Sequence, residues 1–302
     1  MTVEVACDES GLEGEKLVDG CTDVFCHASV RMTVAEAEEC MGELRRMVRS
    51  PAVEYKAFQL QRPKHRDALE WLLSTDGPIH GRASAYLVDR TYLLLLACVD
   101  RLGAPQDVAA AVYRAQRADI ARWAPFLRTL NDLMRWGHVG ANADAEVLVA
   151  QAGALAGDEP SGPVRGFLEL FGMRHAALRA GVEPDPTRPY ALDPLIPAVV
   201  RAVDRWGGDV TVIHHTQRRL TGDRIARIAA ARPALLGVRL ADPLADLRVQ
   251  VADLLAGVTR KAASDELAGH GDAPLTALLR GYVDRSSLWC EQESWARLLG
   301  TG

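Results

Sequence analysis

The sequence predicts an α/β protein in which a mixed sheet is flanked by helices and carries an all-helical insertion. Strand-like segments alternate with helical patterns near the N-terminus and again after residue 195, as in α/β folds. Between Tyr92 and Gly181 all apolar spacing is helical. We therefore expect residues 1–302 to form a single domain, with residues 91–181 as a helical insertion or cap within it.

The N-terminal segment predicts a β-hairpin. Val3, Val5 and Cys7 alternate with other residues and indicate a short strand that ends in the turn-forming tetrad Asp8-Glu9-Ser10-Gly11. A second alternating segment, residues 24–32, follows after a glycine-containing loop. We expect these two strands to pair.

Helices and a further strand follow the hairpin. Thr33 and Glu36 have the spacing of a capping box and predict a helix that runs to about Arg49. Residues 53–58 form a short mixed segment, in which Glu54 and Lys56 share one side if the chain is extended. The remaining elements expected before residue 181 are helix 63–74, strand 80–88 and helices 91–102, 105–119, 121–136, 142–156 and 163–180.

The α/β pattern resumes after a proline-rich connection at residues 183–194. A helix at residues 195–206 leads to the unbroken apolar run 210–213, which predicts a central strand covered on both faces and ending at His214 and His215. Thr221 is suited to cap the next helix. A strand at residues 235–240 follows, and short helices are expected near residues 275–282 and 291–299.

Residues 244–258 predict a mostly buried helix that carries acidic side chains. Its helically spaced apolar stripe consists of Leu244, Leu247, Val251, Leu254 and Val258. Asp246, Gln250, Asp253 and Gly257 fall on one row beside that stripe. A buried carboxylate requires a partner or a metal, although a solvated edge or an Asp–Arg pair explains the pattern equally well. Gly257 would allow another backbone or a ligand to come close.

Several strand-like segments end in, or carry, a possible metal ligand. These residues are Asp8, Glu54, Asp89, His214, His215 and Asp242, and Asp253 would add a ligand from a helix. Carboxylates that converge cannot all remain ionised without a cation. Oxygen ligands suit Mg²⁺ or Mn²⁺, and two such ions can promote phosphodiester hydrolysis. Strands also end in Asp because Asp suits turns, so each residue taken singly has a structural explanation.

Composition excludes some classes of protein. The formal net charge is −5, so a nucleic-acid site would have to be a local basic patch. The N-terminus has no basic segment followed by an apolar one, and no apolar run is long enough to span a bilayer. The six cysteines form no C-x-x-C pair, so we expect reduced thiols and a cytoplasmic protein that contacts no membrane.

Four motifs in order resemble a known family. They are D-E-S-G at residues 8–11, E-x-K at 54–56, V-D-R at 88–90 and Q-x-A-D-L-L-A-G at 250–257. Together they resemble a widespread bacterial domain of unknown function, catalogued as number thirty-eight hundred, which is similar to ribonuclease-H-fold nucleases, integrases and resolvases. The resemblance covers about the first hundred residues and residues 195–262. It implies a ribonuclease-H-like core.

The resemblance also implies a metal site. Asp8, Glu54 and Asp253 are the implied ligands, with Lys56 and Gln250 as neighbours. After the central strand, similar proteins tend to have H-D-x-x-x-x-L-T, whereas this chain has His214-His215 and Thr221 at the matching positions. His215 thus replaces an expected Asp. Imidazole can bind Mn²⁺ or act as a base but is a poor Mg²⁺ ligand, so the chemistry is either adjusted or lost.

Basic residues follow two of the motifs. Arg218 and Arg219 come directly after the histidines; the others are Arg62, Lys64, His65, Arg66, Arg224, Arg227 and Arg232. In a nuclease they would position phosphates, but solvated helix faces explain them equally well.

We expect a metal-dependent nuclease. Asp8, Glu54, Asp253 and His215 would hold Mg²⁺ or Mn²⁺ and act in catalysis. Lys56, Arg218 and Arg219 would contact phosphate, and Gln250 would orient a ligand or water. One alternative is a catalytically weak module that binds nucleic acid or a protein. Another is a metal-dependent hydrolase of a small phosphorylated or modified substrate, over which the helical block closes.

Overall fold

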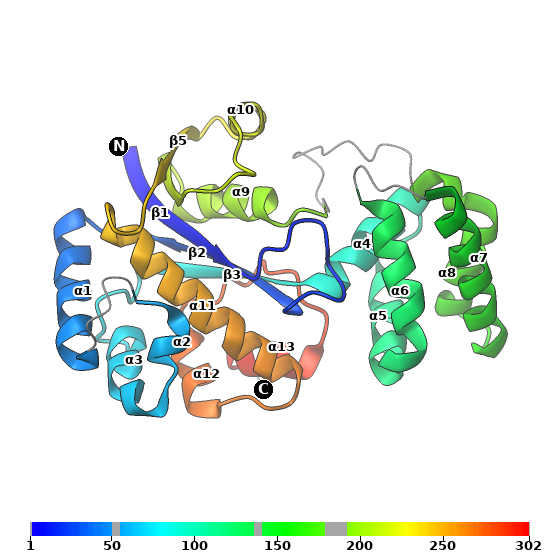
Figure 1. The fold of residues 1–302 in the computed structure, drawn as a ribbon, viewed down its shortest axis with the longest axis horizontal. Helices are drawn as coiled ribbons and strands as arrows, with labels where there is room; N and C mark the ends of the chain where they lie inside the picture. Colours follow the sequence, from blue (N-terminus) through cyan, green and yellow to red (C-terminus); the bar gives the residue numbers. More distant parts are fainter. Residues whose placement is uncertain (1, 50–54, 136–140, 179–191, 302) are drawn as a thin grey trace.

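The computed structural model describes residues 2–49, 55–135, 141–178 and 192–301, and these form a mixed α/β fold (Figure 1). Its five strands lie in the order β3-β2-β1-β4-β5. The strands are β1 Thr2–Ser10, β2 Val24–Val30, β3 Ala83–Asp89, β4 Asp209–His215 and β5 Leu235–Ala241. β2 is antiparallel to both neighbours, while β1, β4 and β5 are parallel. The expected hairpin and mixed sheet are confirmed.

The helices of the described residues lie between β2 and β3, between β3 and β4, between β4 and β5, and after β5. They are α1 Val34–Val48, α2 Ala57–Leu60, α3 Arg66–Leu73, α4 Arg90–Leu102, α5 Asp107–Ala118, α6 Ile120–Met134, α7 Ala141–Asp158, α8 Pro163–Arg174, α9 Leu195–Trp206, α10 Gly222–Ala231, α11 Leu247–Leu267, α12 Ala273–Leu279 and α13 Gln292–Leu299. Short 3₁₀ turns occur at Pro63–His65 and His175–Leu178. The predicted capping box is present, because Thr33 accepts from the Glu36 backbone and the Glu36 side chain accepts from Thr33.

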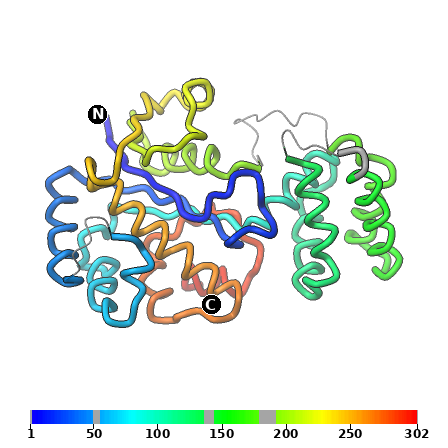
Figure 2. Tube along the Cα trace, in the orientation of Figure 1, coloured from blue at the N-terminus to red at the C-terminus, as the bar shows by residue number. Residues whose placement is uncertain are grey.

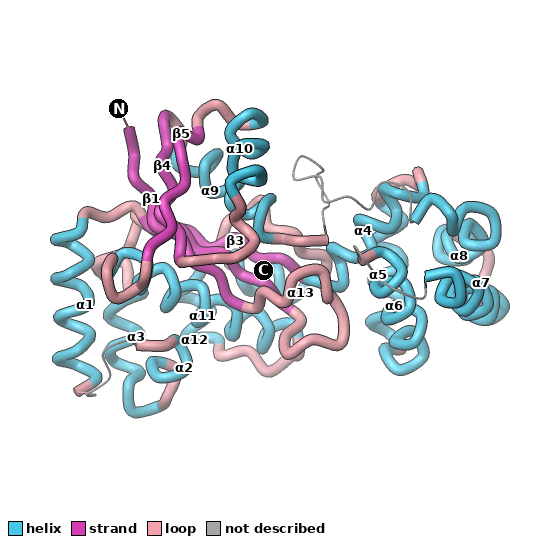
Figure 3. Tube along the Cα trace, turned by 45° about the horizontal axis from the view of Figure 1, so that its top comes forward, coloured by secondary structure: helices cyan, strands magenta, loops and turns pink. Residues whose placement is uncertain are grey.

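Alternation along the strands separates two faces of the sheet. Val5 and Cys7 of β1 pack in a core with α9, whereas Ala6 packs against Val249 of α11. On β2, Phe25 joins the α9 core, and its neighbours in sequence pack with α1, α3 and α11. The sheet is therefore a central layer between helices, as seen with the strands in magenta (Figure 3). Odd-numbered and even-numbered residues near the end of β1 face different helices.

The helical block α4–α8 extends to one side of the sheet (Figure 2). Its aromatic residues Trp123, Phe126 and Phe171 pack in the same core as Val5 and Phe25. The block and the sheet therefore share buried apolar surface, which is the main source of folding free energy.

One residue also fastens the block to the β1–β2 connection. The buried Asn131 side chain of α6 accepts hydrogen bonds from the backbone of Leu17 and Val18 and donates to the carbonyl of Glu15. These bonds satisfy backbone groups that have no partner in a strand.

The predicted start of the acidic helix was wrong. α11 begins at Leu247, because the Asp246 carboxylate caps it by accepting from the Arg248 backbone N–H. Leu244 precedes the helix and is 53% exposed, so it does not extend the apolar stripe. Asp246 also pairs with Arg239 and Arg248, so it is an N-cap and not part of the row. The helix continues nine residues beyond the predicted end at Val258, as far as Leu267.

No helix among the described residues is both long and apolar enough to cross a membrane.

Candidate functional site

The parallel strands β1 and β4 bring Asp8 and His215 together. The last paired residues are Cys7 and His214, so Asp8 and His215 follow at adjacent strand ends. The Nδ1 atom of His215 lies 3.2 Å from one carboxylate oxygen of Asp8 and 3.3 Å from the other. Asp8 is buried, whereas the His215 side chain is 36% exposed. The ends of adjacent parallel strands are the usual place for a site in α/β sheets.

The hydrogen bond to Asp8 raises the pKa of His215, more than burial lowers it. With Nδ1 facing the carboxylate, Nε2 has no partner among the described residues. A carboxylate that holds one ring nitrogen in this way orients the other for a ligand or a proton.

Asp253 and Lys56 form an ion pair beside these residues. Lys56 Nζ lies 3.0 Å from Asp253 Oδ2, and the Asp253 side chain is 15% exposed. Lys56 is close enough to His215 to lower its pKa. The structure therefore brings Asp8, His215, Lys56 and Asp253, four of the residues singled out in the sequence, into one region.

Gly257 allows the two segments that carry this ion pair to meet. A Cβ atom at Gly257 would lie 2.4 Å from the Cβ of Ala57, the residue after Lys56. The predicted close approach at Gly257 is confirmed, and the approaching segment is the start of α2. Any larger residue would push Lys56 away from α11.

Gln250 is fully buried one turn before Asp253. Neither its amide nitrogen nor its amide oxygen has a hydrogen-bond partner in the part of the chain that the structure describes. Buried amides without partners are rare and indicate a water, an ion or a ligand. This favours the predicted role of Gln250 in orienting a ligand or water.

Glu9 was missed by the sequence interpretation. It lies on the α9 face, where its carboxylate accepts a hydrogen bond from Gln217 and lies 3.6 Å from His214 Nε2. Burial, with the charge of Asp8, raises the pKa of Glu9 to about 7. Its Oε2 atom has no hydrogen-bond partner among the described residues. Its position beside Asp8 in D-E-S-G was the signal that could have revealed it.

The rings of His27 and His214 are stacked, and His214 lies beside Glu9. His214 Nδ1 lies 2.9 Å from the His215 carbonyl oxygen and therefore donates to it, which leaves Nε2 as an acceptor for His27 Nε2–H at 3.3 Å. Burial lowers the pKa of both His27 and His214. His214 is thus a neutral support of the strand end and not a site ligand.

Two other strand-end acids are structural. Asp89 caps α4 by accepting from the Tyr92 backbone and accepts a hydrogen bond from the Tyr113 hydroxyl. Asp242 accepts from the Leu244 backbone in a turn. Glu54 lies outside the described residues.

Some of the predicted phosphate-binding arginines form ion pairs with carboxylates, and others are exposed to solvent. Arg219 and Arg224 both pair with the buried Asp193, so Arg219 is held away from the predicted phosphate role. Arg218 is exposed and has no partner among the described residues.

In the other basic cluster, Arg66 pairs with Glu70 and Asp272, and His65 is buried. Arg62 is exposed and lies over the ring of Phe58, which is 60% exposed. This aromatic residue follows Lys56 by two positions.

The donor set fits a divalent cation in part. Asp8 and His215 lie in contact and Glu9 has an orphaned buried oxygen, but no group of three or more His, Cys, Asp or Glu residues within the described ranges could hold a metal. Asp253 is engaged with Lys56.

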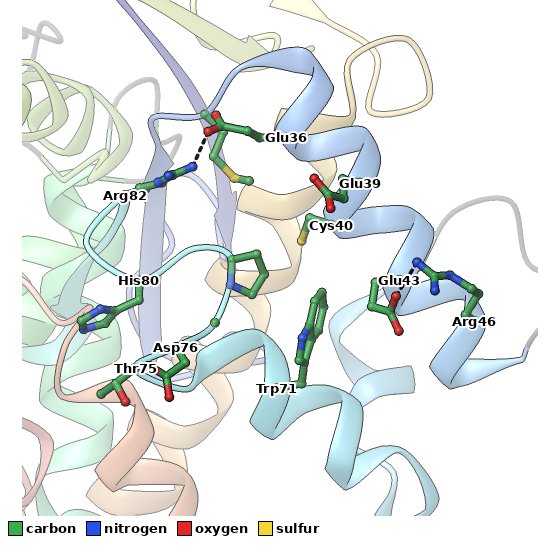
Figure 4. A pocket seen from close by; sticks show the side chains of 13 residues that line it. Glu36, Glu39, Cys40, Glu43, Arg46, Trp71, Thr75, Asp76, His80 and Arg82 are labelled. Carbon is green, nitrogen blue, oxygen red and sulfur yellow. Dashed lines mark hydrogen bonds and ion pairs between the residues drawn. The ribbon is translucent and has the colours of Figure 1, made fainter.

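A separate pocket of about 560 Å³ lies between α1, α3 and the loop before β3 (Figure 4). Glu36 and Glu43 within it pair with Arg82 and Arg46, while Glu39 and Asp76 add further negative charge. None of the predicted site residues lines this pocket.

Comparison with known proteins gives no match to a family model, a curated protein or a solved structure.

Proposed function

We propose that this chain is a divalent-metal-dependent phosphodiester hydrolase that acts on nucleic acid and has a ribonuclease-H-like core. The observation that carries the proposal is the contact between Asp8 and His215 beside the Lys56–Asp253 pair. The sheet supports it, because β2 alone runs against the other four strands, as expected for that fold.

In this proposal Asp8 and His215 would hold the cation. Asp253, which pairs with Lys56 in this structure, would turn toward the cation to complete the site, and Glu54 is the further ligand that the resemblance implies. A bound Mg²⁺ or Mn²⁺ would supply an activated water and stabilise the leaving oxygen. Asp8 fixes the imidazole of His215 through Nδ1. Lys56 neutralises charge at Asp253 and provides a cation for phosphate, and Gln250 orients a water or ligand from its buried position.

A polymeric substrate is favoured by the surface beside Lys56. Phe58 is 60% exposed, and the Cζ atom of Arg62 lies 5.6 Å from the centroid of its ring. Exposed aromatic and arginine side chains beside a site stack on bases of single strands. A small phosphorylated substrate would not use this surface.

The test is cleavage of labelled single-stranded DNA, duplex DNA and RNA in Mn²⁺ or Mg²⁺. Asp253→Asn should reduce metal-dependent cleavage by about 10- to 100-fold, the usual cost of changing a group that holds or orients a metal ligand. Asp265→Asn is the matched control, since it lies on α11 and also pairs with one lysine, Lys261. If Asp253→Asn leaves cleavage intact, the site assignment fails.

A second candidate is a binding module without a metal. The Lys56–Asp253 ion pair favours it, because a lysine ammonium already provides a positive charge at this carboxylate. It predicts no saturable Mn²⁺ binding by calorimetry and no effect of Mn²⁺ on unfolding. Saturable binding that is lost in Asp8→Asn excludes it.

A further inference from the structure

Arg260 lies on the same row of α11 as Asp253 and Gly257, two turns beyond the acid. Its Nε atom donates to the Ser10 hydroxyl at 2.9 Å, and Nη1 donates to the Thr22 hydroxyl at 2.9 Å. Its side chain reaches the D-E-S-G motif at the end of β1. Arg260 thus connects the helix that carries Asp253 to the strand that carries Asp8.

The guanidinium of Arg260 is fixed in place but not neutralised. Across the described ranges, no carboxylate lies within ion-pair distance of it, and its partners are two neutral hydroxyls. Other half-buried arginines among the described residues differ in this respect: Arg219 and Arg224 pair with Asp193, and Arg66 with Asp272. An arginine has five N–H donors in a rigid fork that suits phosphate oxygens. Two hydroxyls leave several of these donors for a ligand.

Gly11 allows the Arg260 side chain to lie close to the backbone after β1. Its φ is +82°, and a Cβ atom there would lie 2.8 Å from Arg260 Cδ and 2.5 Å from the Val24 carbonyl oxygen. Ser10 and Gly11, the last two residues of D-E-S-G, therefore hold Arg260 in position. The first two, Asp8 and Glu9, contact His215 and Gln217. This gives Ser10 a role that does not involve nucleophilic attack.

We propose that Arg260 binds a phosphate of the nucleic-acid strand adjacent to the one that is cleaved, and so sets the register of the strand at Asp8. The inference rests on the proposed function and deepens it. Asp8 and Ser10 are two residues apart on an extended strand, so their Cα atoms are about 7 Å apart, which is comparable with the spacing of consecutive phosphates. A substrate with a single phosphate leaves Arg260 unused.

The first test is binding of a fluorescein-labelled 12-nucleotide single-stranded DNA, and of the same RNA, by anisotropy in EDTA at several salt concentrations. Arg260→Gln should weaken binding about tenfold and lower the magnitude of the salt slope by about 0.7, the value for one phosphate contact with a single strand. Arg260→Lys retains the charge and should recover part of the affinity. Ser10→Ala, which removes one hydroxyl that orients Arg260, should weaken binding less than Arg260→Gln.

Lys261→Gln is the matched control. It removes one positive charge from the adjacent position, where Lys261 is half-exposed and pairs with Asp265. It should bind the strand as the wild type does. Equal losses in Lys261→Gln and Arg260→Gln would show a general charge effect and overturn the proposal.

The second test compares two substrates. Arg260→Gln should lower kcat/KM for the oligonucleotide about tenfold and leave hydrolysis of bis(p-nitrophenyl) phosphate unchanged, since that ester has no neighbouring phosphate. If the wild type binds and cleaves strands and Arg260→Gln matches it, only the Arg260 proposal fails. If the wild type neither binds nor cleaves, the proposed function fails with it. Thermal unfolding of each variant separates these outcomes from misfolding, and Arg260→Lys provides a conservative second variant.

Discussion

The Nδ1 atom of His215 lies 3.2 Å from a carboxylate oxygen of Asp8, although the two residues are 207 positions apart in sequence. The parallel pairing of β1 and β4 creates this contact. It places the His215 imidazole directly against the buried carboxylate of Asp8. The consequence is that the charge of the site can be changed by one substitution.

His215→Asp should alter the metal preference. Two adjacent carboxylates repel each other without a cation, so the metal-free variant should be less stable than the wild type, and Mg²⁺ should restore its stability through linked binding. The measurement is thermal unfolding across a titration of Mg²⁺ and of Mn²⁺. His270→Asp, at an exposed position, is the control. If neither Mg²⁺ nor Mn²⁺ changes the unfolding temperature of His215→Asp, the result contradicts a metal site at Asp8.

Gly257→Ala should destabilise the protein by about 1–3 kcal/mol, because the new Cβ would meet Ala57 at 2.4 Å and overpack the contact. Gly153→Ala in α7 has no atom within 4 Å of the new Cβ and should stabilise by up to about 1 kcal/mol through helix propensity. Denaturant unfolding measures both. Equal effects of the two substitutions would mean that α2 does not press on α11.

Ionisation of the buried Asp89 carboxyl should lower the free energy of unfolding as pH rises from about 4 to about 6. Burial raises the pKa of this carboxyl to about 6, so the folded chain holds the proton more tightly than the unfolded chain, and the advantage is lost as the group ionises. Asp89→Asn should remove up to about 3 kcal/mol of that pH dependence. Unfolding free energies at pH 4, 5, 6 and 7 test this. Asp119→Asn, at the exposed N-cap of α6, controls for the loss of a capping carboxylate, and parallel pH profiles for wild type and Asp89→Asn would contradict the prediction.

Asn131→Ala should destabilise the protein by about 2–4 kcal/mol. It removes the partner of the Leu17 and Val18 backbone N–H groups and of the Glu15 carbonyl, and buried groups without partners are costly. Hydrogen exchange should become faster at Leu17 and Val18. Thr129→Ala, on the exposed side of the same helix, should have an effect below about 0.5 kcal/mol. No change at Leu17 would show that α6 does not hold the β1–β2 connection.

The sequence by itself determined the local elements. The alternation of β1 and β2, the capping box at Thr33 and the buried run of β4 each reflect interactions within a few residues. The row of Gln250, Asp253 and Gly257 on α11 was also readable, because helical geometry fixes which residues share a face. The start of α11 could not be predicted from the sequence, because Asp246 acts as the N-cap and leaves Leu244 outside the helix.

Only the tertiary structure decided which polar groups meet. The sequence placed Asp89, Asp242 and Asp8 equally at strand ends, but Tyr113 engages the first, a turn engages the second, and His215 faces the third. Arg260 was not singled out, since nothing local distinguishes it from its neighbours. Its hydroxyl partners come from residues more than 230 positions away. Contacts of this range depend on strand order and helix packing, which are global properties of the fold and cannot be derived from spacing along the chain.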